Sequence, residues 1–150
     1  MQVAGQTVTI SRLERILITL AAAICLVITL LFWFRISGYQ NMWPLPSLYF
    51  IELVAISITS AFIFVRGDPR GSLITWVAAG VISAFSILGA FSIGFFYLPI
   101  ALIFTVVSVT SDVRNKQHIT AHLAIFLFAG ILQFVLMFIA IRWLDPSAVF

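Results

Sequence analysis

Long apolar runs without charged residues are the feature that most constrains this chain. A helix needs about 20 mostly apolar residues to cross the hydrocarbon core of a bilayer. Runs that approach this length follow one another along the sequence, and only short polar connections separate them. The five runs cover residues 16–34, 47–65, 73–91, 97–111 and 119–141. The sequence therefore predicts an all-α, polytopic transmembrane helical bundle of five spans, with residues 1–150 as a single transmembrane domain.

The composition excludes the other broad classes of protein. Hydrophobic residues make up 63% of the chain and charged residues 9%, whereas about 25% of an ordinary soluble domain is charged. A soluble domain of this size still exposes about 30% of its surface, and a chain this apolar could not cover that surface with polar groups. The eight Lys and Arg residues are scattered in the connections, so a nucleic-acid partner is not expected.

The third and fourth runs form one stretch without any charge, from Ser72 to Ser111. As a single helix it would be about 60 Å long, which is twice the hydrocarbon thickness. Gly89, Gly94 and Pro99 cluster near its middle, and such residues break helices. We therefore place a turn at residues 92–96, followed by a short fourth span. Four spans plus a re-entrant hairpin is the alternative, but two full crossings let the charged flanks fit one topology.

The basic residues indicate the orientation. Connections on the cytoplasmic side of a membrane are enriched in Lys and Arg. The predicted topology therefore has a cytoplasmic N-terminus and an outside C-terminus, in a multi-pass protein of the cell (inner) membrane. The inner segments would hold Arg12, Arg15, Arg66, Arg70, Arg114 and Lys116, and the outer segments Arg35 and Arg142.

Small and polar residues recur at helical spacing in four of the spans. Because lipid tails are as apolar as leucine, helices in a bilayer associate through small residues and occasional hydrogen bonds. We therefore interpret these stripes as helix-packing faces. They comprise Glu52, Ala55 and Thr59; Ser72, Thr75, Ala79, Ser83, Ser86 and Ala90; Ala101, Thr105, Ser108 and Asp112; and His118, His122, Ala129, Gln133 and Ala140.

Glu52 is the one carboxylate clearly inside a predicted span. A charge at mid-membrane costs about 3 kcal/mol on insertion scales, so this side chain needs a partner or a proton. Arg35, at the outer end of the first span, is the nearest candidate partner in a simple hairpin and could reach inward. A structural pair or a contact to another subunit is favoured, and proton or cation coupling is the alternative.

His118 and His122 form an i, i+4 pair at the inner end of the fifth span. This spacing can place two imidazoles on one metal ion, with Asp112 as a third ligand, but zinc sites use three or four clustered ligands. No metal site is therefore predicted. His122 could instead ligate a haem or chlorophyll from its apolar helix. Two interfacial histidines beside Arg114 and Lys116 are the simpler interpretation.

Residues 89–102 read Gly-Ala-Phe-Ser-Ile-Gly-Phe-Phe-Tyr-Leu-Pro-Ile-Ala-Leu. This stretch resembles one in small, uncharacterised bacterial multi-pass inner-membrane proteins, which carry a Phe-Ser-Ile-Gly turn followed by Leu-Pro and a short last helix. The resemblance implies a bacterial inner-membrane topology and no particular activity. Here a further long span follows, which departs from that pattern.

No catalytic motif is present: the sequence lacks a P-loop, Gly-x-Ser-x-Gly, His-Glu-x-x-His and Cys-x-x-Cys, so an enzyme is not expected. The sequence favours a non-catalytic accessory or structural subunit that contacts the lipid bilayer and other subunits of a larger membrane complex, with respiratory and photosynthetic complexes as candidates. Two alternatives remain open. One is a small transporter or channel component that uses Glu52 as its coupling group, and the other is a haem- or chlorophyll-binding subunit that uses His122.

Overall fold

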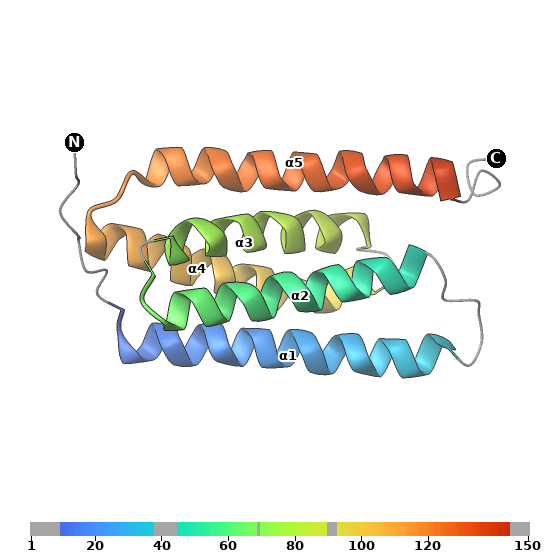
Figure 1. Ribbon diagram of the computed structural model, residues 1–150, viewed down its shortest axis with the longest axis horizontal. Coiled ribbons are helices and arrows are strands. Elements are labelled where there is room, and N and C mark those ends of the chain that lie inside the picture. Colours follow the sequence, from blue (N-terminus) through green and yellow to red (C-terminus); the bar gives the residue numbers. More distant parts are fainter. Residues whose placement is uncertain (1–9, 38–44, 69, 90–92, 145–150) are drawn as a thin grey trace.

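The computed structural model describes residues 10–37, 45–68, 70–89 and 93–144, and these residues form a bundle of antiparallel helices (Figure 1). Five segments are long and apolar enough to cross a membrane, so the predicted five-span helical bundle is confirmed. The elements are α1 (Arg12–Ser37), α2 (Leu45–Val65), α3 (Gly71–Leu88), the 3₁₀ helix η1 (Gly94–Tyr97), α4 (Leu98–Asn115) and α5 (Ile119–Leu144).

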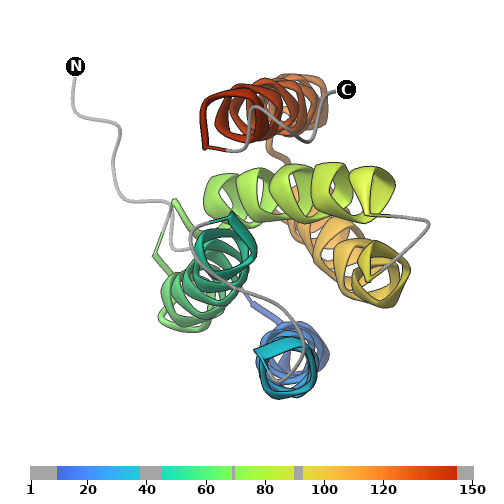
Figure 2. The ribbon, with the colours of Figure 1, turned by 90° about the vertical axis from the view of Figure 1, so that its right-hand side faces the viewer.

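Helix α3 lies at the centre of the bundle. It contacts α2, α4 and α5, while α1 packs against α2 and α4 on the far side. Figure 2 shows the same arrangement end-on, with α5 on one side of α3 and the other helices on the opposite side. The two helices differ accordingly in burial, because 67% of the most apolar window of α3 is buried and only 17% of that of α5.

Small residues explain the central position of α3. In a bilayer, helices gain little from hydrophobic burial against each other, so close backbone contact contributes much of their association. Gly80 of α3 faces the backbone of α5, and a Cβ atom added at Gly80 would overlap the carbonyl oxygen of Phe126 and lie 3.2 Å from the amide nitrogen of Gly130. The residue at position 80 must therefore be glycine if the two helices are to stay this close.

The third and fourth spans are each long and apolar enough to cross a membrane. α3 has 18 residues, and η1 and α4 together give a candidate span of 22 residues, Gly94–Asn115, or about 27 and 33 Å of helix. The prediction of a short fourth span was therefore wrong. The polar C-terminal end of α4 remains helical because Asp112 is hydrogen-bonded inside the bundle. In addition, the Asn115 side chain donates to the carbonyl oxygen of Ser111 at 2.9 Å.

The predicted turn at residues 92–96 is also displaced. The amide of Gly94 donates to the carbonyl oxygen of Gly89 at 2.7 Å, and η1 already begins at Gly94. A Cβ atom at either glycine would come within 3.0 Å of the other glycine's backbone. The pair of glycines therefore allows the chain to reverse tightly, and residues 94–96 belong to the helical segment. Residues 90–92 lie outside the described part of the chain.

Helix α1 begins at Arg12, four residues before the predicted span. The hydroxyl oxygen of Ser11 accepts a hydrogen bond from the amide of Glu14 at 3.2 Å, and the Glu14 carboxylate accepts one from the amide of Ser11 at 3.1 Å. This reciprocal pair is a capping box, which satisfies backbone amides that the first helical turn leaves unpaired. The Ser-x-x-Glu spacing was readable in the sequence.

Replacing Gly80 with alanine is expected to destabilise the bundle. The added methyl group would force α5 away from α3, and overpacking of this kind costs about 1–3 kcal/mol. Gly130→Ala is the matched control on the facing helix, because a Cβ atom there would lie no closer than 3.3 Å from its nearest neighbour. Unfolding in mixed detergent micelles, followed by circular dichroism, would measure both. Equal stability of the two variants would contradict the inferred close contact.

Candidate functional site

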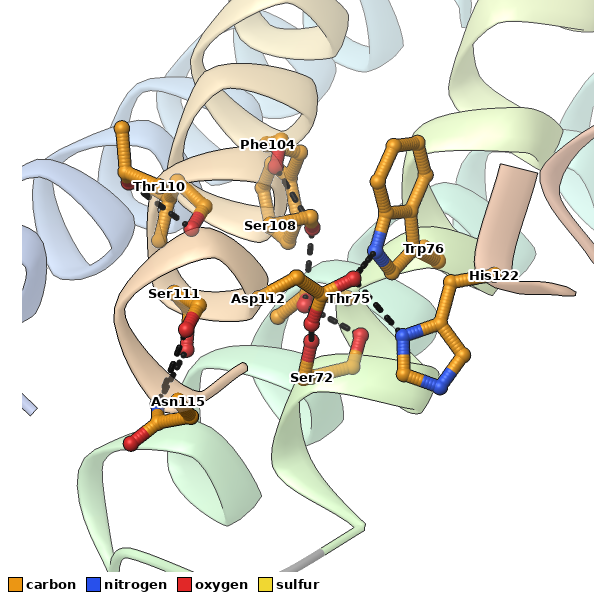
Figure 3. A network of polar contacts seen from close by, with 11 residues as sticks. Ser72, Thr75, Trp76, Phe104, Ser108, Thr110, Ser111, Asp112, Asn115 and His122 are labelled. Atoms are coloured by element: carbon orange, nitrogen blue, oxygen red, sulfur yellow. Dashed lines mark hydrogen bonds and ion pairs between the residues drawn. The ribbon is translucent and has the colours of Figure 1, made fainter. Parts of the chain in front are cut away.

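Asp112, in the last turns of α4, is the centre of the largest polar cluster in the described structure (Figure 3). Its side chain is fully buried. One carboxylate oxygen accepts a hydrogen bond from the hydroxyl of Ser72, and the other accepts one from the indole nitrogen of Trp76 at 2.7 Å. The same second oxygen lies 2.7 Å from Nδ1 of His122. One carboxylate therefore connects α3, α4 and α5.

The spacing of residues on α3 and α4 builds this cluster. Ser72 and Trp76 are four residues apart and share a face of α3, which turns both donors towards Asp112. One helical turn further along, the hydroxyl of Ser108 donates to the hydroxyl of Thr75 at 2.9 Å. The helices are thus joined by two successive polar contacts, and Thr75 in turn donates to the carbonyl oxygen of Ser72 at 2.7 Å.

His122 and His118 have different surroundings although they lie one turn apart on α5. The His122 side chain is 16% exposed and forms a contact with Asp112, whereas His118 is exposed. The second ring nitrogen of His122 points away from the carboxylate (Figure 3). A carboxylate that orients an imidazole in this way is typical of metal-ligating histidines. Haem or chlorophyll ligation by His122 nevertheless stays a prediction, as does any contribution from His118.

Within the described ranges, no three His, Cys, Asp or Glu side chains gather into a group that could hold a metal ion. Asp112 is adjacent to His122, but its two oxygens are already occupied by donors from α3 and α5. The arrangement can therefore hold the three helices together.

A second carboxylate links α2 to α5. The amide nitrogen of Gln133 donates to Oε2 of Glu52 at 2.8 Å, and the hydroxyl of Tyr49 donates to the carbonyl oxygen of Met137 at 3.3 Å. Gln133 is buried and Glu52 is partly exposed. Glu52 lies seven residues inside α2, or about 10 Å from its beginning. Gln133 is thus a partner of Glu52 that the sequence did not assign, and the predicted pairing with Arg35, in the last turn of α1, stays a prediction.

Two further contacts join α1 to the rest of the bundle. The Glu14 carboxylate, which is buried, forms an ion pair with Arg114 of α4. Near the other end of α1, the hydroxyls of Thr29 and Tyr97 lie 2.9 Å apart. Within the described residues, every buried side-chain nitrogen or oxygen has a hydrogen-bond partner, which is what a hydrocarbon surrounding requires.

The remaining residues of the predicted stripes differ in burial. Ser86 and Ala129 are buried, Ser83 is half-buried, and Ala90 lies outside the described residues. The stripe predicted on α2 differs from the observed packing face, because Ala55 and Thr59 are exposed. The buried small residues of that helix are Ser47, Ser57, Ser60 and Ala61. A span with small residues on several sides does not reveal from sequence which side faces its neighbours.

Comparisons with models of protein families, with curated protein sequences and with solved structures find no match. The class of the protein therefore follows from its fold, and the chain is a multi-pass integral membrane protein with five candidate spans. The resemblance of residues 89–102 to small bacterial inner-membrane proteins stays a prediction.

Replacing Asp112 with alanine is expected to destabilise the bundle by about 3 kcal/mol, because removing one member of a buried polar group leaves its partners without an acceptor. Asp68→Ala, in the exposed connection between α2 and α3, is the control and is expected to change stability by less than about 1 kcal/mol. Thermal unfolding of the detergent-solubilised variants would test this difference. Equal stability of the two variants would show that the cluster does not hold the helices together.

Proposed function

We propose that this protein is a non-catalytic structural subunit that packs against other integral membrane subunits. The observation that carries the proposal is that polar side chains lie inside the bundle and large apolar side chains lie outside. In the described spans, every buried side-chain nitrogen or oxygen has a hydrogen-bond partner within the protein, and large apolar side chains cover the outside. Such a molecule offers little chemistry to a substrate in its interior and a broad apolar surface to neighbours.

Helix α5 supports this proposal best. It has 26 residues and lies on one side of the bundle, where it contacts chiefly α3. Phenylalanines project from its uncovered surface, with Phe128 67% and Phe138 57% exposed. Aromatic side chains bury large areas when a second helix packs against them. The outer face of α5 is therefore the surface that we assign to a neighbouring subunit.

Apolar grooves also favour contact with lipid or helices over a polar pathway. A groove of about 440 Å³ lies between α1 and α2 and is lined by residues such as Leu30, Trp33 and Val54. A second groove of about 240 Å³ lies beside the Gly80 contact, between α3 and α5. Both are lined almost wholly by apolar side chains, which suit acyl chains or side chains of a partner.

The orientation in the membrane is part of the proposal. Arg12 and Arg15 of α1 lie at the same end of the bundle as the α2–α3 and α4–α5 connections (Figure 1). These connections and the adjoining helix ends hold four more basic residues, so six of the eight basic residues lie at one end. By the positive-inside rule this end is cytoplasmic, and the C-terminal end of α5 is then outside.

A second candidate function is a small transporter or channel component in which Glu52 couples transport to a cation. The observation that favours it is the position of this carboxylate, which is partly exposed within a spanning helix. Ionisable residues in such positions often mark ion pathways or proton relays.

Photo-crosslinking would test the structural-subunit proposal. Benzoylphenylalanine at Phe128 or Phe138 is expected to give an adduct of defined mass with one other membrane protein when cells are irradiated. The same substitution at Phe104, whose side chain is fully buried, is the control and should give no intermolecular adduct. Adducts of the α5 positions with lipid alone, or only with a second copy of this chain, would contradict the proposal.

Cysteine labelling would test the orientation. Arg70 and Ser37 are exposed at opposite ends of the bundle, and the native Cys25 is fully buried. In intact cells, a membrane-impermeant maleimide is expected to label Ser37→Cys, and to label Arg70→Cys only after the membrane is permeabilised. The reverse pattern would require the opposite orientation.

A further inference from the structure

A groove of about 360 Å³ lies between α1 and η1, near the end of α1. Its walls are the apolar side chains of Ile28, Leu31, Phe32 and Phe96, and among the described residues that line it Arg35 alone is charged. Within the described part of the chain, this groove shares no lining residue with the groove between α1 and α2. It therefore offers an apolar surface that ends at a single positive charge.

Two contacts hold the walls of this groove in place. The hydroxyls of Thr29 in α1 and Tyr97 in η1 lie 2.9 Å apart, and both side chains are buried. The rings of Phe32 and Phe96 pack against each other with their centroids 5.4 Å apart. A ligand that enters a groove with fixed walls loses less free energy to the ordering of the protein. The groove is therefore preformed.

The groove lies at the depth of one lipid leaflet. Arg35 is in the last turn of α1, and Ile28 lies seven residues before it, about 10 Å along the helix. Trp33 lies two residues before Arg35, and Trp143 lies near the end of α5, at the same end of the bundle (Figure 1). Because tryptophan is enriched at the membrane–water interface, the guanidinium lies near the phospholipid headgroups. The apolar walls then extend through about two thirds of the roughly 15 Å of hydrocarbon in one leaflet.

We propose that this groove binds one phospholipid of the adjoining leaflet. One acyl chain lies along the apolar walls, and the headgroup phosphate accepts hydrogen bonds from the Arg35 guanidinium. A guanidinium has five N–H donors in a planar arrangement that matches pairs of phosphate oxygens. It can therefore bind two phosphate oxygens and still keep a further contact within the protein. This site goes beyond the proposed structural role, because it needs no protein partner.

Size and charge favour a lipid over a helix of another subunit as the occupant. A helical segment 10 Å long and about 10 Å across occupies about 800 Å³, which is more than twice the volume of the groove. A single acyl chain is narrow and can lie along the whole groove. A phospholipid also places a phosphate anion at the level of Arg35, whereas a partner helix would need a carboxylate at that position. The groove is therefore complementary to a phospholipid in both shape and charge.

Lipid binding to the full chain in detergent micelles tests this site. The purified, delipidated protein is titrated with dioleoyl phosphatidylglycerol, and native mass spectrometry counts the bound lipid molecules. We expect one tightly bound phospholipid, and Arg35→Gln should weaken its binding about tenfold because the charge-assisted contacts with phosphate are lost. Arg142→Gln is the matched control and should leave binding unchanged. Arg142 is exposed in the last turn of α5, at the same end of the bundle, and does not line this groove.

Dioleoylglycerol, which has the same acyl chains and no phosphate, tests the contribution of the headgroup. It should bind about tenfold more weakly than the phospholipid, and Arg35→Gln should not weaken its binding further. Equal affinity for the two lipids would overturn the assignment of a phosphate contact. Equal losses in Arg35→Gln and Arg142→Gln would overturn it as well, because they would indicate a general attraction of lipid to basic residues.

A tryptophan in the groove tests the acyl-chain contact without removing a charge. Leu31 is 65% exposed, so Leu31→Trp should fill the groove and prevent phospholipid binding in a protein that still elutes as a monodisperse species. Val27→Trp is the control, because Val27 is 54% exposed on the same helix and does not line the groove. Retained binding in Leu31→Trp, or loss of binding in both tryptophan variants, would show that the lipid does not occupy this groove.

Discussion

The structure depends on the rule that polar groups placed in hydrocarbon must find partners within the protein. The Asp112 cluster follows from this rule most directly, because one buried carboxylate is bonded from α3 and α5 while it belongs to α4. Hydrophobic burial cannot hold these helices together, since lipid would cover their apolar faces equally well. The polar contacts and the close backbone approach at Gly80 therefore decide which helices become neighbours.

Helix α5 shows how two polar contacts can fix the position of a helix against the bundle. His122 and Gln133 are eleven residues apart, which is about three turns and about 16 Å along the helix, so they share one face. Each contacts a carboxylate from a different helix, Asp112 of α4 and Glu52 of α2. Between them the backbone of α5 passes close to Gly80. The rest of α5 is free to face lipid or the proposed subunit, which explains its nearly uniform apolar composition.

The two carboxylates inside the bundle differ in burial and in the number of their hydrogen-bond donors. Asp112 is fully buried and accepts hydrogen bonds from α3, so its side chain holds helices together and does not face the surroundings. Glu52 has a single amide partner in α5 and remains partly exposed. A structural subunit requires only the first arrangement. The partly exposed Glu52 is the feature on which the second candidate function rests.

The number and approximate limits of the spans were determined by the sequence alone, because bilayer thickness requires long uncharged runs and such runs are visible without a structure. The extended end of α4 and the partners of the carboxylates were decided only by the tertiary structure. Asp112 looked like the polar end of a short span because its donors come from Ser72, Trp76 and His122, which lie 40, 36 and 10 residues away. Hydrogen bonds across such separations leave no local pattern, so sequence periodicity predicts a polar face but not the helix that it meets.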